Sequence, residues 1–277
     1  MPLRQLGRTG VRVPALGVGT NRWGVPGKGA GAVSPVFNAA LELGANLFDT
    51  AELYWGSERA LGECMRRNPR PIFIVDKFAP YPTRLSPRSL LKALDASLAR
   101  LGTQAIDLYL IHFPFTLVPM TSFLDVLAEA ALAGKVRAVG VSNFSARQMH
   151  AAAERLERHG LALAANEVHY SLLHRNPERN GVLEACRKLD TALIAYRPLA
   201  GGRIREGSRT LDQTLADIAR ARRKTVAQVA LSWLLRQDER IIAIPGSTGV
   251  SHLLENVEAA SWTLSDEESA ALVRASS

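Results

Sequence analysis

Residues 71–112 read PIFIVDKFAPYPTRLSPRSLLKALDASLARLGTQAIDLYLIH, and their pattern indicates a fold class. Two short apolar runs, Pro71–Phe78 and Ile106–His112, lack a strict alternation of polar and apolar residues, which is typical of parallel strands buried on both faces. Between them, Pro87–Gly102 carries leucines on one helical stripe and stops at a glycine. The stretch therefore predicts a strand–helix–strand unit with parallel strands.

The same alternation continues through the rest of the chain. Amphipathic segments separate eight apolar runs, which are Ala15–Thr20, Asn46–Thr50, Pro71–Phe78, Ile106–His112, Ala138–Asn143, Ala162–His169, Ala192–Leu199 and Ile241–Ser247. Eight strand–helix units close naturally into a (β/α)8 TIM barrel, an α/β fold, and a doubly wound open sheet is the competing topology. We predict the barrel, preceded by a short β-hairpin in which Leu3–Leu6 and Val11–Val13 flank a glycine-bounded turn.

Capping signals mark the starts of several expected helices. A serine or threonine side chain at a helix start accepts a hydrogen bond from the first turn. The helices expected from these signals are Glu58–Arg67 after Ser57, the segment between Ser145 and Gly160, Val226–Arg236 after Thr225, and a last helix that Ser265 starts.

Length and composition indicate one globular domain over residues 1–277. The chain is 47% hydrophobic, which is enough for a large core. It has no run of about 18 apolar residues that would span a membrane, and its N-terminus lacks the apolar stretch of a signal peptide. The two cysteines, Cys64 and Cys186, lie in apolar, helix-like stretches. We therefore expect reduced thiols in a cytoplasmic protein.

The formal net charge of +8 is dispersed along the chain. Its densest cluster, Arg220, Arg222, Arg223 and Lys224, ends an expected helix, where cations interact favourably with the helix dipole. We interpret this cluster as a solvated face and expect neither a nucleic acid nor a membrane as partner. The positive field would still favour a small anion such as a nucleotide phosphate. We expect a monomer or a weak oligomer.

Ionisable residues end three consecutive predicted strands. Asn46–Asp49 ends in a carboxylate, Ile72–Lys77 in an ammonium group and Leu108–His112 in an imidazole, while Tyr54 follows in the loop after the first of these. Each residue alone has an ordinary structural explanation, such as a turn or a packed ring. The active site of a β/α barrel, however, lies at the C-terminal ends of its strands. Their coincidence on adjacent strand ends therefore predicts one site.

The chemistry of such a site follows from the four side chains. A buried Lys77 needs a counter-charge, and Asp49 is the obvious one. A nearby ammonium group stabilises a phenolate, so we expect Lys77 to lower the pKa of Tyr54 from about 10 and make it a general acid. His112 would orient a substrate oxygen. A site that has a proton donor but neither a nucleophile nor a metal cluster suits carbonyl reduction. The hydride would then come from a cofactor.

Several segments together resemble the aldo-keto reductase family over nearly the whole chain. They are Phe48–Glu58, Leu110–His112, Gly134–Phe144, Tyr170–Arg175, Tyr196–Leu199, Ile244–Ser247 and Glu255–Asn256. The resemblance implies a (β/α)8 barrel with a nicotinamide cofactor extended across the strand ends. It also implies hydride transfer to an aldehyde or ketone, with Tyr54 as the acid.

The resemblance assigns cofactor contacts as well. It implies that Ser142 and Asn143 bind the carboxamide and that Tyr196 stacks on the nicotinamide ring. The other implied contacts are Thr20 near the ribose or pyrophosphate, Leu199 and Gly201 along the pyrophosphate, Gly246, Ser247, Thr248 and His252 around the 2′-phosphate, Glu255 and Asn256 at the adenine, and Asp49, Pro198 and Ile244 elsewhere along the cofactor.

Three sites depart from the family pattern. Glu167 stands where the family usually has glutamine, so it can accept a hydrogen bond from the carboxamide but not donate one. Arg197 replaces a common serine and could reach a cofactor phosphate. Gly246 and His252 stand where many members place lysine and arginine, so the 2′-phosphate would rely more on backbone groups. NADPH is favoured, and use of NAD stays open.

Aromatic residues after the strand ends predict a wall of the substrate site; they are Trp23, Trp55, Phe113 and Phe115. Since no long loop follows the last expected helix, we expect an open site for small or aromatic aldehydes. Other enzyme classes fit poorly, because Gly140–Phe144 lacks the second glycine of a hydrolase elbow and Gly17–Gly24 lacks the Rossmann spacing. No metal-ligand spacing is present. The alternative is a non-catalytic or redox-sensing nicotinamide-binding barrel subunit.

Overall fold

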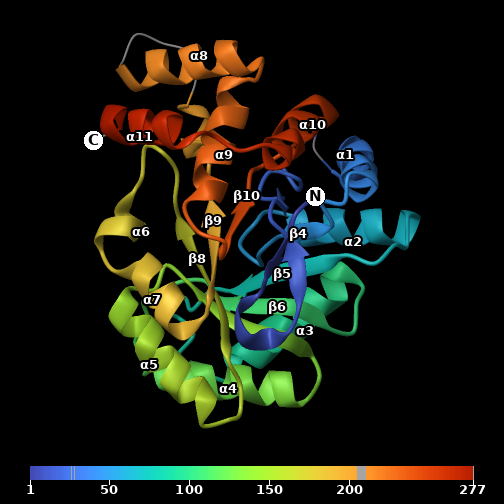
Figure 1. The fold of residues 1–277 in the computed structure, drawn as a ribbon. Coiled ribbons are helices and arrows are strands. Elements are labelled where there is room, and N and C mark those ends of the chain that lie inside the picture. The colour runs from blue at the N-terminus through green and yellow to red at the C-terminus, as the bar shows by residue number, and fades with distance from the viewer. Residues whose placement is uncertain (26, 28, 205–209, 277) are drawn as a thin grey trace.

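The computed structural model describes residues 1–25, 27, 29–204 and 210–276, and a ring of parallel strands lies at its centre (Figure 1). Bridges from Leu16 to Ala243 and from Gly19 to Gly246 join the first strand of this ring to the last. The predicted (β/α)8 TIM barrel is confirmed, and the open sheet was the wrong alternative. Within the described residues the order of the ring is β10 (Ile241–Ile244), β9 (Ala192–Tyr196), β8 (Leu163–His169), β7 (Val136–Ser142), β6 (Ile106–Ile111), β5 (Phe73–Phe78), β4 (Leu47–Asp49) and β3 (Val18–Gly19).

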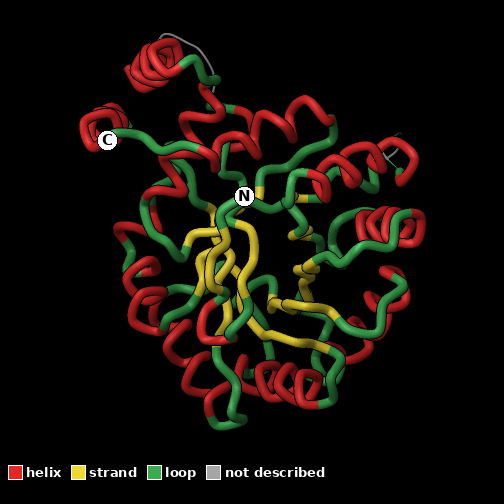
Figure 2. Tube along the Cα trace, turned by 45° about the vertical axis from the view of Figure 1, so that its right-hand side comes forward, coloured by secondary structure: helices red, strands yellow, loops and turns green. Residues whose placement is uncertain are grey.

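Helices surround this ring, with at least one helix after every strand (Figure 2). They are α1 (Ala30–Glu42), α2 (Ser57–Arg67), α3 (Ser89–Leu101), α4 (Met120–Leu132), α5 (Ala146–Glu157), α6 (Asn176–Arg179), α7 (Val182–Leu189), α8 (Thr210–Arg222), α9 (Val226–Arg236), α10 (Val250–Glu258) and α11 (Asp266–Ala275). None of the helices in the described ranges is long and apolar enough to cross a bilayer.

Capping boxes confirm three of the four expected helix starts. Ser145, Thr225 and Ser265 each accept a hydrogen bond from the backbone three residues on, and the side chain there bonds back to the cap. The expectation for Ser57 is wrong. Helix α2 already includes this residue, and its hydroxyl donates to the carbonyl oxygen of Thr20 at 2.8 Å. The start of α2 is thereby tied to the end of β3.

The N-terminal hairpin closes one end of the barrel. Its strands β1 (Leu3–Gln5) and β2 (Arg12–Pro14) pair antiparallel, as predicted. Leu6 and Val13 are buried in one cluster with strand residues such as Leu110. Because apolar side chains fill this end, the C-terminal strand ends remain for a functional site.

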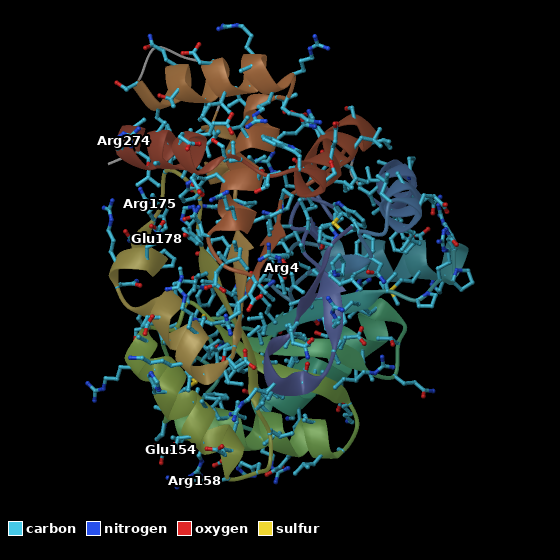
Figure 3. The ribbon with its side chains drawn as sticks, viewed as in Figure 1. Arg4, Glu154, Arg158, Arg175, Glu178 and Arg274 are labelled. Carbon is cyan, nitrogen blue, oxygen red and sulfur yellow. The ribbon has the colours of Figure 1, made fainter. Side chains whose placement is uncertain are left out.

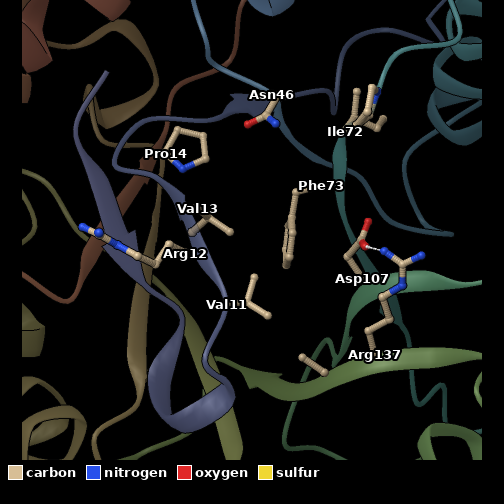
Figure 4. Close-up of a pocket in the computed structure, with 11 residues that line it drawn as sticks. Val11, Arg12, Val13, Pro14, Asn46, Ile72, Phe73, Asp107 and Arg137 are labelled. Atoms are coloured by element: carbon tan, nitrogen blue, oxygen red, sulfur yellow. Dashed lines mark hydrogen bonds and ion pairs between the residues drawn. The ribbon is translucent and has the colours of Figure 1, made fainter.

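A pocket of about 220 Å³ lies beside the hairpin (Figure 4). Its lining includes Val13 of β2 and the residues Phe73, Asp107 and Arg137, which lie at the starts of β5, β6 and β7. Asp107 accepts a hydrogen bond from Arg137 at 2.7 Å. The pocket is therefore at the opposite end of the barrel from the ionisable residues that end the strands.

Charged side chains are spread over the outside of the molecule (Figure 3). On α5, Arg158 forms an ion pair with Glu154 at 2.7 Å. In the basic cluster that ends α8, Arg222 forms an ion pair with Glu268 of α11, also at 2.7 Å. Such exposed pairs contribute little to stability, and their dispersal agrees with the interpretation of a solvated face.

Candidate active site

The predicted ionisable residues meet at one rim of the barrel. Asp49 is the last residue of β4, Lys77 is the last but one of β5, and His112 follows β6. These three strands are neighbours in the sheet. Tyr54 lies in the loop between β4 and α2, where its N–H donates to the carbonyl oxygen of Ala51 at 2.9 Å and turns the chain back toward the rim.

Lys77 is the buried centre of this group. Its side chain is fully buried, and its ammonium group is ion-paired with Asp49 and donates to the carbonyl oxygen of Thr50 at 2.9 Å. A second carboxyl group, that of Glu167, lies 3.3 Å away. Burial lowers the pKa of Lys77, but the two carboxyl groups outweigh burial and raise it above its ordinary value. The ammonium group is therefore charged at neutral pH.

Tyr54 lies between this ammonium group and the imidazole. The centroid of its ring is 5.1 Å from the Lys77 nitrogen and 5.9 Å from the centroid of the His112 ring. The expected direction of its pKa is wrong: burial raises the pKa of Tyr54, and the opposing effect of Lys77 does not compensate. The phenol consequently keeps its proton at neutral pH, which is the form that a general acid needs.

His112 is held in its neutral form. Burial, followed by the charge of Lys77, lowers its pKa to about 3. The imidazole nitrogen Nδ1 is buried and has no hydrogen-bond partner in the described part of the chain. A neutral imidazole has one donor and one acceptor nitrogen, so His112 can hydrogen-bond a substrate oxygen without adding a charge.

The lowered pKa of His112 predicts a pH-dependent stability. The unfolded chain binds a proton on this residue near pH 6.5, whereas the folded chain resists protonation down to about pH 3. Stability is therefore unaffected above pH 6.5 and falls as the pH decreases below it. Between pH 7.5 and 4.5 we expect wild type to lose about 2 kcal/mol more unfolding free energy than His112→Gln, measured by urea denaturation. Parallel losses in the two proteins would contradict the assignment.

A hydrogen-bonded row of side chains lies beside this group. Asn143 has a φ of 63°, a region that asparagine tolerates better than most residues. Its amide nitrogen donates to the carbonyl oxygen of His112 at 3.1 Å, and its amide oxygen accepts from the Tyr196 hydroxyl at 2.9 Å. The Ser142 hydroxyl donates to the carbonyl oxygen of Glu167 at 2.9 Å. The row joins the ends of β6, β7, β8 and β9 into one polar surface.

The other predicted cofactor residues lie at the ends of β3, β9 and β10 and on α10. Thr20 is buried and donates to the carbonyl oxygen of Asp49 at 2.7 Å. Asn256 of α10 donates to the Ser247 hydroxyl at 3.1 Å and so ties the loop after β10 to this helix. Of the remaining predicted residues, Pro198 and Ile244 are buried, and those at least partly exposed are Arg197, Leu199, Gly201, Gly246, Thr248, His252 and Glu255.

The predicted aromatic wall is only partly present. Trp55 and Phe115 are 77% and 76% exposed, and Phe113 stacks on the neighbouring imidazole with the ring centroids 4.3 Å apart. Trp23 differs from the expectation, because it is fully buried and its indole N–H donates to the carbonyl oxygen of Ser247 at 2.9 Å. This indole supports the loop after β10 and presents no surface to a substrate.

Two features of the site were missed in the sequence pattern. Glu167 was considered only as a cofactor contact, yet its carboxyl group lies beside Lys77; the signal was an ionisable residue inside an apolar run. Gly24 was considered only as part of a glycine-containing stretch without the Rossmann spacing. A Cβ atom at this position would lie 1.7 Å from the carbonyl oxygen of Trp55, so only glycine lets the first loop pack against the Tyr54 loop.

Comparison with known proteins agrees with this arrangement. The model of the aldo/keto reductase family matches residues 15–276. The chain belongs to the aldo/keto reductase family. This aldo/keto reductase is 33% identical to a 6-dehydroglucose reductase of Novosphingobium aromaticivorans, with 92% of this chain and 89% of the relative covered. It is 30% identical to a chloroplastic pyridoxal reductase of Arabidopsis thaliana, with 89% and 77% covered.

Solved structures of the family share the whole fold of this aldo/keto reductase. A thermostable aldo-keto reductase in complex with the inhibitor epalrestat superimposes with a TM-score of 0.89 at 35% identity and covers 99% of this chain and 100% of its own. An aldo/keto reductase from Klebsiella pneumoniae in complex with NADP and acetate has a TM-score of 0.87 at 30% identity, with 98% and 94% covered.

Proposed function

We propose that this aldo/keto reductase transfers a hydride from NADPH to the carbonyl group of aldehydes or ketones. The observation that carries the proposal is the position of one protonated phenol, on Tyr54, beside the buried ammonium group of Lys77 and the neutral ring of His112. Family membership supports the same chemistry. The proposal makes one barrel domain over residues 1–277 the catalytic unit.

Each side chain has a separate task in this proposal. Tyr54 donates the proton that the reduced carbonyl oxygen takes. Lys77 stabilises the phenolate that remains, because its positive charge lies 5.1 Å from the ring centroid. Asp49 keeps Lys77 charged and in place. His112 hydrogen-bonds the substrate oxygen and orients it toward the phenol.

The residues at the rim fit a nicotinamide cofactor. Such a cofactor supplies the hydride when bound. Ser142 and Asn143 present hydroxyl and amide groups in one row, and the Tyr196 ring lies beside them, fixed by its hydrogen bond to Asn143. These groups suit a carboxamide and a flat ring. The structures of Klebsiella pneumoniae relatives with NADP and with NADPH support the choice of cofactor.

The substrate proposal rests on the exposed aromatic side chains that follow the strand ends. Trp55 and Phe115 are exposed next to the site and would contact a flat or small apolar substrate. Similar proteins are named as reductases of 6-dehydroglucose, pyridoxal and, in Escherichia coli, methylglyoxal. We therefore propose small and aromatic aldehydes as the substrate class, including aldehydes of the size of pyridoxal.

The proposed partners and compartment follow from the remaining features. Both cysteines, Cys64 and Cys186, are buried and free, which suits a reducing compartment such as the cytoplasm. Basic residues are dispersed along the sequence rather than gathered in one run, so we propose that no nucleic acid is a partner. We propose a small-molecule carbonyl as the partner and a monomer or weak oligomer as the working form.

Cofactor titration followed by a carbonyl panel tests the proposal. We expect NADPH to quench protein fluorescence with a Kd about tenfold lower than that of NADH, because Ser247 and Thr248 offer hydroxyl groups to a 2′-phosphate. Oxidation of NADPH by 4-nitrobenzaldehyde should then be measurable at 340 nm. Tighter binding of NADH would contradict the cofactor assignment. Tight binding of NADPH without turnover of any carbonyl would instead favour a redox-sensing subunit.

A further inference from the structure

Glu167 brings a second carboxyl group to a buried ammonium group. It lies on β8, opposite Ser142 on β7 and Ile194 on β9. Its side chain is nearly fully buried, and its oxygen Oε2 lies 3.3 Å from the nitrogen of Lys77. Among the described residues this oxygen has no hydrogen-bond partner. A buried carboxyl oxygen without a hydrogen-bond partner destabilises the folded protein, and more so when the group is ionised. Whether Glu167 is ionised or neutral is therefore the question.

The charges at the site do not balance when every group is ionised. Lys77 supplies one positive charge, whereas Asp49 and Glu167 together would supply two negative charges in a space that excludes water. Two buried carboxylates beside one ammonium group repel each other, which favours the retention of one proton by the pair. Burial, followed by the charge of Asp49, raises the pKa of Glu167 well above its usual range.

The donors of Lys77 connect this proton to Tyr54. An ammonium group has three N–H donors. One is directed to Asp49 and one to the carbonyl oxygen of Thr50, so the third is left for either Glu167 or the phenol of Tyr54. An ionised Glu167 attracts this donor far more strongly than a neutral one.

The groups that face Glu167 come from four parts of the structure. They are Asp49 of β4, Lys77 of β5, Tyr54 of the loop before α2 and Tyr196 of β9. Lys77 is the only cation of this set within the described residues. Ionisation of Glu167 therefore gives the set a net negative charge, and a negative charge opposes the loss of a proton from Tyr54.

We propose that Glu167 carries a proton at neutral pH and acts as a positioning residue that keeps Lys77 available to Tyr54. Loss of this proton to solvent at alkaline pH draws the ammonium group toward Glu167 and weakens the phenol as an acid. The inference rests on the proposed reductase function for its kinetic consequence. The protonation state of Glu167 is inferred independently of that function.

The pH profile of carbonyl reduction tests the kinetic consequence. Glu167→Gln keeps the size of the side chain and cannot ionise. The kcat of each protein is divided by its own value at pH 7. As the pH rises toward about 10, we expect the kcat of wild type to fall about threefold to tenfold more than that of Glu167→Gln. The reason is that buried glutamates ionise as high as about pH 8–9. Glu129→Gln, on the exposed face of α4, is the matched control and should follow wild type. Coincident profiles of wild type and Glu167→Gln would overturn the proposal.

A titration without substrate or cofactor separates the inference from the function. Tyrosine labelled with ¹³C at Cζ gives a signal for Tyr54 that is assigned by its absence in Tyr54→Phe. We expect the signal to shift at alkaline pH in wild type as Glu167 ionises, and to show no such step in Glu167→Gln. The same step in both proteins would refute the role of Glu167. If the step is present but no carbonyl is reduced, the reductase proposal fails and the inference stands.

Discussion

Replacing Tyr54 by phenylalanine is expected to lower kcat for carbonyl reduction by about 10²- to 10⁴-fold. The substitution removes one hydroxyl group and leaves the ring against His112, where the two ring centroids are 5.9 Å apart. Burial holds the phenol in its protonated form at neutral pH, so the substitution deletes the proton donor of the proposed reaction. His112 cannot substitute, since its pKa of about 3 leaves it neutral.

Cofactor binding separates loss of chemistry from loss of structure in this experiment. Within the part of the chain that the structure describes, the row of Ser142, Asn143 and Tyr196 forms no hydrogen bond with the Tyr54 hydroxyl. The Kd for NADPH should therefore stay within about twofold of wild type. Tyr81→Phe is a matched control, because it removes a phenol from a residue that is 43% exposed and packs on Arg84. Equal kcat values in Tyr54→Phe and wild type would remove the phenol from the mechanism.

Replacing Lys77 by methionine is expected to lower the unfolding free energy by about 3–5 kcal/mol. The substitution keeps most of the volume of the side chain and deletes its charge. Asp49 then loses its ion-pair partner while both it and Glu167 remain buried. Urea denaturation at pH 8 measures the loss, because ionised carboxylates are favoured at that pH. Activity should fall as well, since the phenolate of Tyr54 loses its stabilising charge.

Two further variants test whether the loss of stability in Lys77→Met comes from the unpaired buried carboxylate. Lys77→Met combined with Asp49→Asn removes an unpaired carboxylate, and we expect it to be about 1–2 kcal/mol more stable than Lys77→Met alone. Lys135→Met deletes one partner of an exposed ion pair with Asp95 and should cost less than about 1 kcal/mol. A Lys77→Met protein as stable as Lys135→Met would show that the buried charge is unimportant.

Most of the barrel and the core of the site were predictable because parallel strands leave a local signal. Each strand is a short apolar run, and the residue type at its end is visible without any knowledge of distant contacts. Asp49, Lys77 and His112 were found in this way, and the sheet places β4, β5 and β6 side by side. Helix starts with a capping box were equally local, as at Thr225.

The errors arose where packing between distant segments matters. Ser57 has the residue type of a cap, but its hydroxyl bonds the end of β3 instead. Trp23 follows a strand end like an exposed rim residue, yet the loop after β10 covers it. The pKa of Tyr54 depends on how far burial outweighs Lys77, and the sequence does not show burial of a loop residue.

The order of polar residues along this chain was enough to predict a parallel barrel and the chemical groups at its rim, because strand periodicity and strand ends are local properties. The protonation of those groups was not accessible in the same way. Glu167 and Lys77 are 90 residues apart in the chain, and their 3.3 Å approach exists only after β5 and β8 have closed into one barrel. Charge interactions depend on distance and on exclusion of water, and both are set by the folded chain.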